Sequence, residues 1–122
     1  MNVKEIANDL VKHCRLGQYE EVVKKYYSPA IRSIEPASDP QEVQGIEAII
    51  EKGKQWEKDF EVHGLEISDP VVADDYFSCV MAIDSTHRPS GQRSTSSEVC
   101  VYEVKDGKIV MEQFFYKMPT EM

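Results

Sequence analysis

The stretch from Val101 to Met111, VYEVKDGKIVM, carries the clearest structural signal in the chain. Asp106 and Gly107 at its centre both tolerate positive φ, and the residues on either side alternate between apolar and polar. This pattern predicts two antiparallel strands joined by a tight turn. The same period of two continues through the second half of the chain and predicts four strands, at residues 61–67, 76–87, 92–104 and 108–117.

The first half of the chain predicts helices, because apolar residues recur there at helical spacing. Gly17 is placed to end the first helix, and Glu35-Pro36 is placed to close a strand. The expected elements are helices at residues 3–16, 19–27 and 45–60, a brief strand at residues 30–34, and a loop through Ser38, Asp39 and Pro40.

These elements predict an α+β fold in a single domain, residues 1–122. Strands of about ten residues are long for a small domain, and such a sheet must twist and coil, which gives it a concave and a convex face. The three N-terminal helices need to bury their apolar stripes, and the concave face is the place for them. We therefore expect helices packed on a strongly curved, mostly antiparallel sheet, with a cavity at its open end.

Composition argues against several classes of function. The 122 residues include 14 basic and 22 acidic side chains, and the net charge of −8 disfavours binding to nucleic acid or to anionic membranes. No apolar run approaches the roughly 20 residues of a membrane span and the first residues do not resemble a signal peptide, so we expect a cytoplasmic protein. The three cysteines and three histidines match no zinc spacing, and we expect no metal and no cofactor.

Five short motifs, taken in order, resemble those of one superfamily. They are Gly17-Gln18-Tyr19, Glu35-Pro36, Gly45-Ile46-Glu47-Ala48-Ile49, Asp106-Gly107-Lys108-Ile109-Val110 and Glu112-Gln113-Phe114-Phe115-Tyr116. Together they resemble the nuclear transport factor 2-like superfamily, in its SnoaL-like, polyketide cyclase-like and ketosteroid-isomerase-like branch. The resemblance covers almost the whole chain and implies a cone-shaped, cystatin-like α+β barrel, a pocket for a small organic ligand, and a homodimer through the sheet. Members are isomerases, cyclases, dehydratases, hydrolases or binding proteins, so the fold alone does not settle the chemistry.

The resemblance gives Glu35 a candidate role. In ketosteroid isomerases a carboxylate just before a proline, after the first strand, is the general base, and burial can raise the pKa of such a group toward neutrality. A solvated loop glutamate is the equal alternative. The resemblance puts Leu10 where that family has its oxyanion-binding tyrosine and Cys100 where it has the partner acid. Without these two donors, a steroid isomerase proper is not expected.

Strand alternation orients the other candidates. In residues 76–87, the register aligned with the family turns Val80, Ala82 and Asp84 inward, and a slip of one residue would turn Cys79, Met81 and Ile83 inward instead. We expect the first register, because it leaves the more apolar set on the convex face, where sheets pair in dimers. On the two later strands the inward residues are expected to be Glu98, Cys100, Tyr102, Glu112, Phe114 and Tyr116.

Several carboxylates in one cavity suit acid/base chemistry, because like charges force at least one of them to take up a proton. The alternatives are that Arg32, Arg88 or Arg93 neutralises them in structural ion pairs, or that they stay solvated at the wide end of the cone. The candidate catalytic residues are Glu35, Asp84, Glu98 and Glu112. The candidate ligand contacts are Trp56, Phe60, Val80, Cys100, Tyr102, Phe114 and Tyr116, although aromatic residues at such spacing more often belong to a core.

Two functions follow from these observations. The first is a pocket enzyme of the isomerase or cyclase type that uses carboxylate acid/base chemistry on a small carbonyl compound. The second is a non-catalytic ligand-binding or dimeric assembly module of the same fold, which the replaced oxyanion donors favour.

Overall fold

A curved sheet is the frame of the computed structural model, which describes residues 2–36 and 41–117. The strands in these two ranges are β1 (Tyr27–Ile34), β2 (Glu42–Gln44), β3 (Phe60–Ile67), β4 (Val71–Ala73), β5 (Tyr76–His87), β6 (Gln92–Lys105) and β7 (Lys108–Phe115). They form one sheet of order β2-β1-β7-β6-β5-β3, with β4 paired to β5. β1 is parallel to β7 and the other pairs are antiparallel, which confirms a mostly antiparallel α+β fold.

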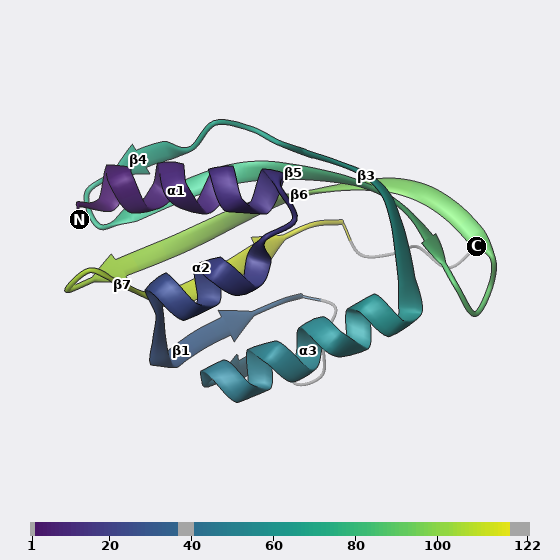
Figure 1. Ribbon diagram of the computed structural model, residues 1–122, viewed down its shortest axis with the longest axis horizontal. Helices are drawn as coiled ribbons and strands as arrows, with labels where there is room; N and C mark the ends of the chain where they lie inside the picture. Colours follow the sequence, from purple (N-terminus) through teal and green to yellow (C-terminus); the bar gives the residue numbers. More distant parts are fainter. Residues whose placement is uncertain (1, 37–40, 118–122) are drawn as a thin grey trace.

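Helices α1 (Val3–Arg15), α2 (Tyr19–Tyr26) and α3 (Ile46–Asp59) all lie on one side of this sheet (Figure 1). α1 begins with a capping box, in which the side chain of Asn2 accepts a hydrogen bond from the Glu5 backbone and the Glu5 carboxylate accepts one from the Asn2 backbone. α1 gives way to α2 at Gly17, whose φ of 72° is the left-handed conformation that ends many helices. The predicted pair of N-terminal helices is confirmed.

Three differences from the expected elements concern short segments. Tyr27 is the first residue of β1, where it pairs with Ile109 of β7, and is not the end of α2. β2 and β4 were not expected, because three-residue strands are too short to show a period. The expected loop residues Ser38, Asp39 and Pro40 lie outside the described residues.

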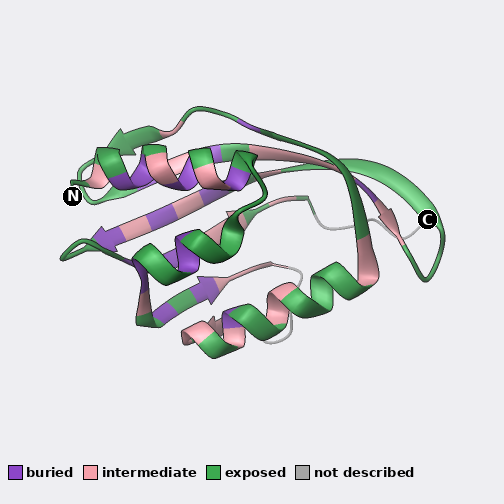
Figure 2. Cartoon of the chain, in the orientation of Figure 1, coloured by how far each residue is buried: buried purple, intermediate pink, exposed green. Residues whose placement is uncertain are grey.

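The core lies at one end of the sheet, under α1 and α2. Figure 2 shows buried residues concentrated there and exposed residues along the far part of β6 and along β3. The core includes Ile6 and Leu10 of α1, Ile31 of β1 and Phe77 of β5, all at most 1% exposed. Residues 92–97 of β6 are all exposed, so the far half of the β5–β6 hairpin extends beyond the packed core.

The expected register of β5 is wrong. Cys79 lies directly opposite Cys100 of β6, and residues opposite each other in neighbouring strands point to the same face. Phe77 and Cys79 are therefore buried in the core and Met81 packs against it, whereas Val80 is 46% exposed on the outer face. Ala82 and Asp84 share that outer face by alternation. The register of β6 and β7 is as expected, since Glu98, Cys100, Tyr102, Glu112 and Phe114 all point toward the helices.

The outer face of the sheet carries a row of apolar side chains. Val80, Val99 and Phe115 are direct neighbours across β5, β6 and β7, and each is 42–49% exposed. Below we call these three residues the outer apolar row.

The turn that joins β6 and β7 gives a stability prediction. Gly107 has a φ of 76°, so Gly107→Ala is expected to lower the free energy of unfolding by about 1–2 kcal/mol. Gly53 lies inside α3, and a Cβ added there would meet no other atom within 4 Å. Gly53→Ala is therefore expected to raise the free energy of unfolding by about 1 kcal/mol. Urea unfolding of both variants measures the pair, and effects of the same sign would contradict the assignment of the turn.

Candidate functional site

Glu112 of β7 is a buried carboxylate at the centre of a hydrogen-bonded cluster. Its side chain is 1% exposed, and it accepts hydrogen bonds from the Tyr27 hydroxyl and, at 2.6 Å, from the Ser33 hydroxyl. Ser33 is brought there by the parallel pairing of β1 with β7, which sets it beside Glu112. Burial raises the pKa of Glu112, and the hydrogen bonds from Ser33 and Tyr27 oppose that rise. Glu112 is therefore held in place by the sheet rather than exposed to a ligand.

Lys52 of α3 connects this cluster to Glu35. Its ammonium donates a hydrogen bond of 2.7 Å to the Ser33 hydroxyl and lies 2.9 Å from the Glu35 carboxylate. It also lies over the ring of Phe114, 5.7 Å from the ring centroid, as in a cation–π contact. Glu35 is thus not a solvated loop residue, because its side chain is 22% exposed and ion-paired with Lys52.

Glu98 of β6 is the carboxyl best suited to exchange protons near neutral pH. Burial raises its pKa from 4.5 to about 7, and the charges of Glu35 and Glu112 act in the same direction. A hydrogen bond from the Cys100 thiol, 3.7 Å from Glu98 Oε1, and the charge of Lys52 oppose the shift. Near pH 7 a carboxyl of this kind can both accept and return a proton.

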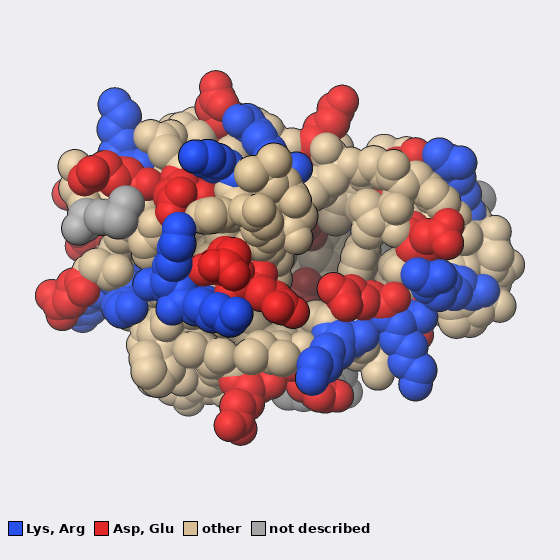
Figure 3. All heavy atoms as spheres, in the orientation of Figure 1, with Lys and Arg blue, Asp and Glu red and all other residues tan. Residues whose placement is uncertain are grey.

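These groups lie at the margin of the core, where the sheet extends beyond the helices. Figure 3 shows this face of the molecule hollowed between the helices and the far end of the sheet, with acidic side chains inside the hollow. On β6 the inward positions beyond Glu98 are Ser96 and Ser94, opposite Ile83 and Ser85 of β5. This inner face of β5 and β6 is therefore polar as well as apolar.

The expected aromatic ligand contacts divide into two groups. Trp56 and Phe60 stack at 5.0 Å between ring centroids, at the end of α3 that leads into β3, and Phe60 also contacts His87. Phe114 is partly buried beneath Lys52 and Tyr116 is half-buried just after β7. By contrast, Tyr102 and Cys100 are at most 2% exposed, and Tyr102 stacks on Phe77 within the core.

Two expected site residues lie away from the hollow. Asp84 is on the outer face, where Arg93 donates two hydrogen bonds to it, of 3.0 and 2.8 Å, and this pairing holds the pKa of Asp84 below its usual range. Val80 belongs to the outer apolar row. The expectation that Asp84 and Val80 face the cavity is wrong for the reason given for β5, and for Asp84 the alternative of an arginine ion pair is the one observed.

Three residues of the site were not anticipated from the sequence: Lys52, Ser33 and Tyr27. Lys52 follows the buried Ile49 by three positions, and helical spacing puts the two on one face of α3. Ser33 alternates with the buried Ile31 in the same way along β1. Both signals were present in the sequence.

Two further properties concern only residues 2–36 and 41–117. No group of three or more His, Cys, Asp or Glu side chains in these ranges is arranged to hold a metal ion. None of the helices there combines the length and apolar character needed to cross a bilayer.

A helix-covered curved sheet with buried carboxylates beside a hollow defines a class of small α+β pocket proteins. Within this class, the chain belongs to the family of SnoaL-like domains, whose model matches residues 1–116. A crystal structure from Mesorhizobium loti, described as a candidate SnoaL-like polyketide cyclase and also as a carbohydrate phosphatase, is 35% identical, with a TM-score of 0.90 over 95% of this chain and 100% of that one.

Two more distant structures share the fold. A candidate isomerase from Bacillus subtilis is 18% identical, with a TM-score of 0.74 over 96% of this chain and 90% of that one. An NTF2-like protein of unknown function from Burkholderia pseudomallei is 14% identical, with a TM-score of 0.78 over 96% and 92%. No curated protein matches the chain. The family and fold expected from the five motifs are confirmed.

Proposed function

We propose that the chain is an enzyme of the isomerase or cyclase type that moves a proton next to the carbonyl group of a small organic compound. The observation that supports this most is Glu98, a half-buried carboxyl on the inner face whose pKa is about 7. A general base works best when its pKa lies near the working pH. The expected role of Glu35 as the base passes to Glu98, because Glu35 is occupied by Lys52.

In the proposed reaction, ionised Glu98 removes a proton from the carbon beside the carbonyl, and negative charge develops on the carbonyl oxygen. The ammonium of Lys52 is close enough to Glu98 to lower its pKa, and in this proposal its charge stabilises that oxygen. Lys52 therefore stabilises the oxyanion in place of the two donors that Leu10 and Cys100 replace. Leu10 and Cys100 cannot do so, because both are buried in the core. Returning the proton to another carbon gives isomerisation, and attack of the carbanion on a second carbonyl gives ring closure. Neither step requires a cofactor.

Exchange of α-protons for deuterium tests the proposal without knowledge of the natural substrate. Cyclohexanone in D2O is followed by NMR with the wild-type chain, and exchange is expected to accelerate with rising pH with a midpoint near 7. Glu98→Gln is expected to lower the protein-catalysed rate by about 10²–10⁴-fold, because it removes the base. Glu57→Gln, on the exposed side of α3, is the matched control.

Two results would contradict the proposal. One is exchange that is as fast with Glu98→Gln as with the wild type. The other is thermal stabilisation of the wild type by small ketones with no acceleration of exchange, which would favour the non-catalytic binding module.

We also propose a homodimer that pairs through the outer face of the sheet. The outer apolar row supports this, because three adjacent apolar side chains of 42–49% exposure form a patch that a second copy can cover. Val99→Glu places two like charges near each other across such an interface, and we expect it to convert the dimer to a monomer in light scattering at micromolar concentration. Ile50→Glu, at an exposed position of α3, is expected to leave the dimer intact. A monomeric wild type would contradict the proposal.

A further inference from the structure

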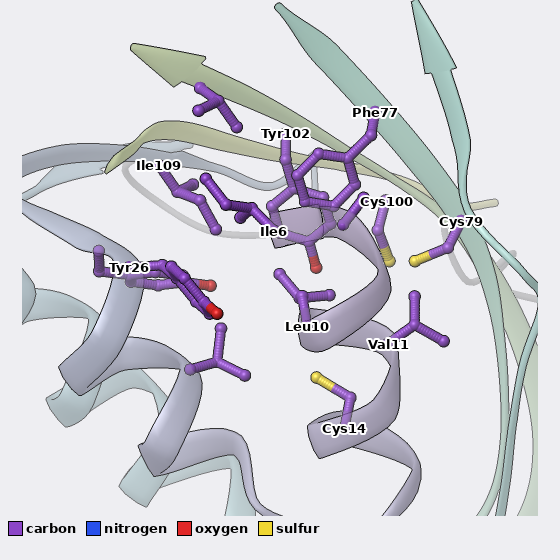
Figure 4. Close-up of a cluster of buried hydrophobic side chains, with 14 of the residues drawn as sticks. Ile6, Leu10, Val11, Cys14, Tyr26, Phe77, Cys79, Cys100, Tyr102 and Ile109 are labelled. Carbon is purple, nitrogen blue, oxygen red and sulfur yellow. The ribbon is translucent and has the colours of Figure 1, made fainter. Parts of the chain in front are cut away.

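Cys79 and Cys100 form a pair of facing thiols beside the candidate site. They are direct partners across β5 and β6, and both are buried, at 3% and 0% exposure. Figure 4 shows the two sulfur atoms turned toward each other, with Cys14 of α1 further away. Opposite residues in antiparallel strands have Cα atoms about 4.5–5.5 Å apart. That separation lies within the range of about 4.4–6.8 Å that a disulfide spans.

The surroundings of the two thiols differ in a way that favours reaction. The Cys100 thiol lies 3.7 Å from Glu98 Oε1 and also faces the sulfur of Cys79, and its single hydrogen can be donated to one of these two acceptors at a time. The hydrogen bond from Cys100 lowers the pKa of Cys79, with a smaller contribution from the charge of Arg15, while burial and the charge of Glu98 oppose this shift. For Cys14 each interaction raises the pKa instead, and burial above all brings it to about 12. Cys79 is thus the better nucleophile of the three.

We propose that Cys79 and Cys100 are a peroxide-reactive dithiol that closes to a cross-strand disulfide. The thiolate of Cys79 attacks one oxygen of hydrogen peroxide, the O–O bond breaks, and a sulfenic acid and water form after protonation. The sulfur of Cys100 then attacks the sulfur of Cys79, its proton passes to Glu98, and the sulfenic oxygen leaves as water after taking up a proton. In sum, two thiols and one peroxide give one disulfide and two waters.

We infer that hydrogen peroxide reaches the pair past the side chain of Glu98. Glu98, which contacts Cys100, is only half-buried, so solvent reaches the side chain next to the Cys100 thiol. Peroxide is small enough to pass Glu98 during side-chain motion, whereas bulky thiol reagents are not. Reaction is therefore expected to be selective for small oxidants.

The disulfide changes the candidate site because it removes the thiol hydrogen that Glu98 accepts. That hydrogen bond lowers the pKa of Glu98, so oxidation raises the pKa further and leaves less of the base ionised at pH 7. This consequence rests on the proposed function, whereas formation of the disulfide does not.

Mass spectrometry of the full-length chain tests the proposal. The protein is treated with hydrogen peroxide, unfolded in the presence of an alkylating reagent, and digested. We expect a peptide pair joined through Cys79 and Cys100, with Cys14 alkylated, and full recovery of three alkylated cysteines after treatment with dithiothreitol. Cys14→Ser is expected to behave like the wild type, and Cys79→Ser and Cys100→Ser are expected to form no intramolecular disulfide.

The readout is a covalent bond and needs no turnover, so its failure is distinguishable from failure of the proposed function. A disulfide that includes Cys14, or irreversible oxidation of Cys79 without a disulfide, would overturn the proposal. So would three reduced cysteines in the folded chain under conditions that oxidise the urea-unfolded chain.

Discussion

Replacing Glu98 with Gln is expected to raise the free energy of unfolding by about 3 kcal/mol at pH 8 and to leave it nearly unchanged at pH 4. Burial raises the pKa of Glu98 from 4.5 to about 7. The folded state therefore binds a proton that the unfolded state has released, and stability falls as the pH rises through this interval. Each tenfold difference in proton affinity corresponds to about 1.4 kcal/mol, which gives the stated size above pH 7. The Gln side chain does not ionise in this pH range, so it avoids the cost of burying a charge.

Urea unfolding between pH 4 and pH 8 measures this effect. Glu57→Gln, at an exposed position of α3, is expected to leave the pH dependence of the wild type unchanged. If Glu98→Gln and the wild type lose stability equally between pH 4 and pH 8, then Glu98 does not titrate near 7 and cannot be the proposed base. The measurement thus examines the site without any substrate.

Tyr27→Phe is expected to lower the free energy of unfolding by about 2 kcal/mol at pH 7. The Tyr27 hydroxyl donates to buried Glu112 and lies 3.1 Å from the hydroxyl of Tyr19, so its removal takes one hydrogen-bond partner from the buried carboxylate and one from Tyr19, which is 39% exposed. The Glu112 carboxylate loses a hydrogen-bond donor that stabilises its ionised form, so its pKa rises further. The cost of the substitution should therefore grow with pH.

The matched control for Tyr27→Phe is Tyr76→Phe. Tyr76 is 46% exposed and donates a hydrogen bond of 3.3 Å to Glu103 in contact with solvent, so its loss is expected to cost less than about 0.5 kcal/mol. Equal effects of the two substitutions would mean that the hydroxyl of Tyr27 contributes no more than a surface group.

Much of the fold could be predicted because local signals agree with the tertiary structure. The turn at Asp106 and Gly107 and the alternation on its two sides determine which residues of β6 and β7 point inward. β5 differs, since the run from Phe77 to Ile83 is apolar on both faces except for Ser78. A run of that kind holds no period, and only pairing with β6 determines which face is buried.

The candidate site was only partly predictable, because its contacts join segments far apart in the chain. Glu98 and Glu112 could be placed by alternation along their own strands. The link from Lys52 through Ser33 to Glu112 depends on how α3 lies over β1 and on the parallel pairing of β1 with β7. The parallel pair joins residues that lie far apart in the sequence, such as Ser33 and Glu112, so no local sequence pattern predicts it.

The far half of the β5–β6 hairpin is supported along one edge only, because β5 pairs there with β3 whereas β7 pairs with β6 only from Val99 onward. Residues 92–97 are exposed on both faces, so the hydrogen bonds to β5 are the main support of that half of β6. At the other end of the hairpin, Phe77 and Tyr102 stack on each other in the core. We therefore expect the backbone amides of residues 92–97 to exchange with solvent faster than those around Phe77 and Tyr102.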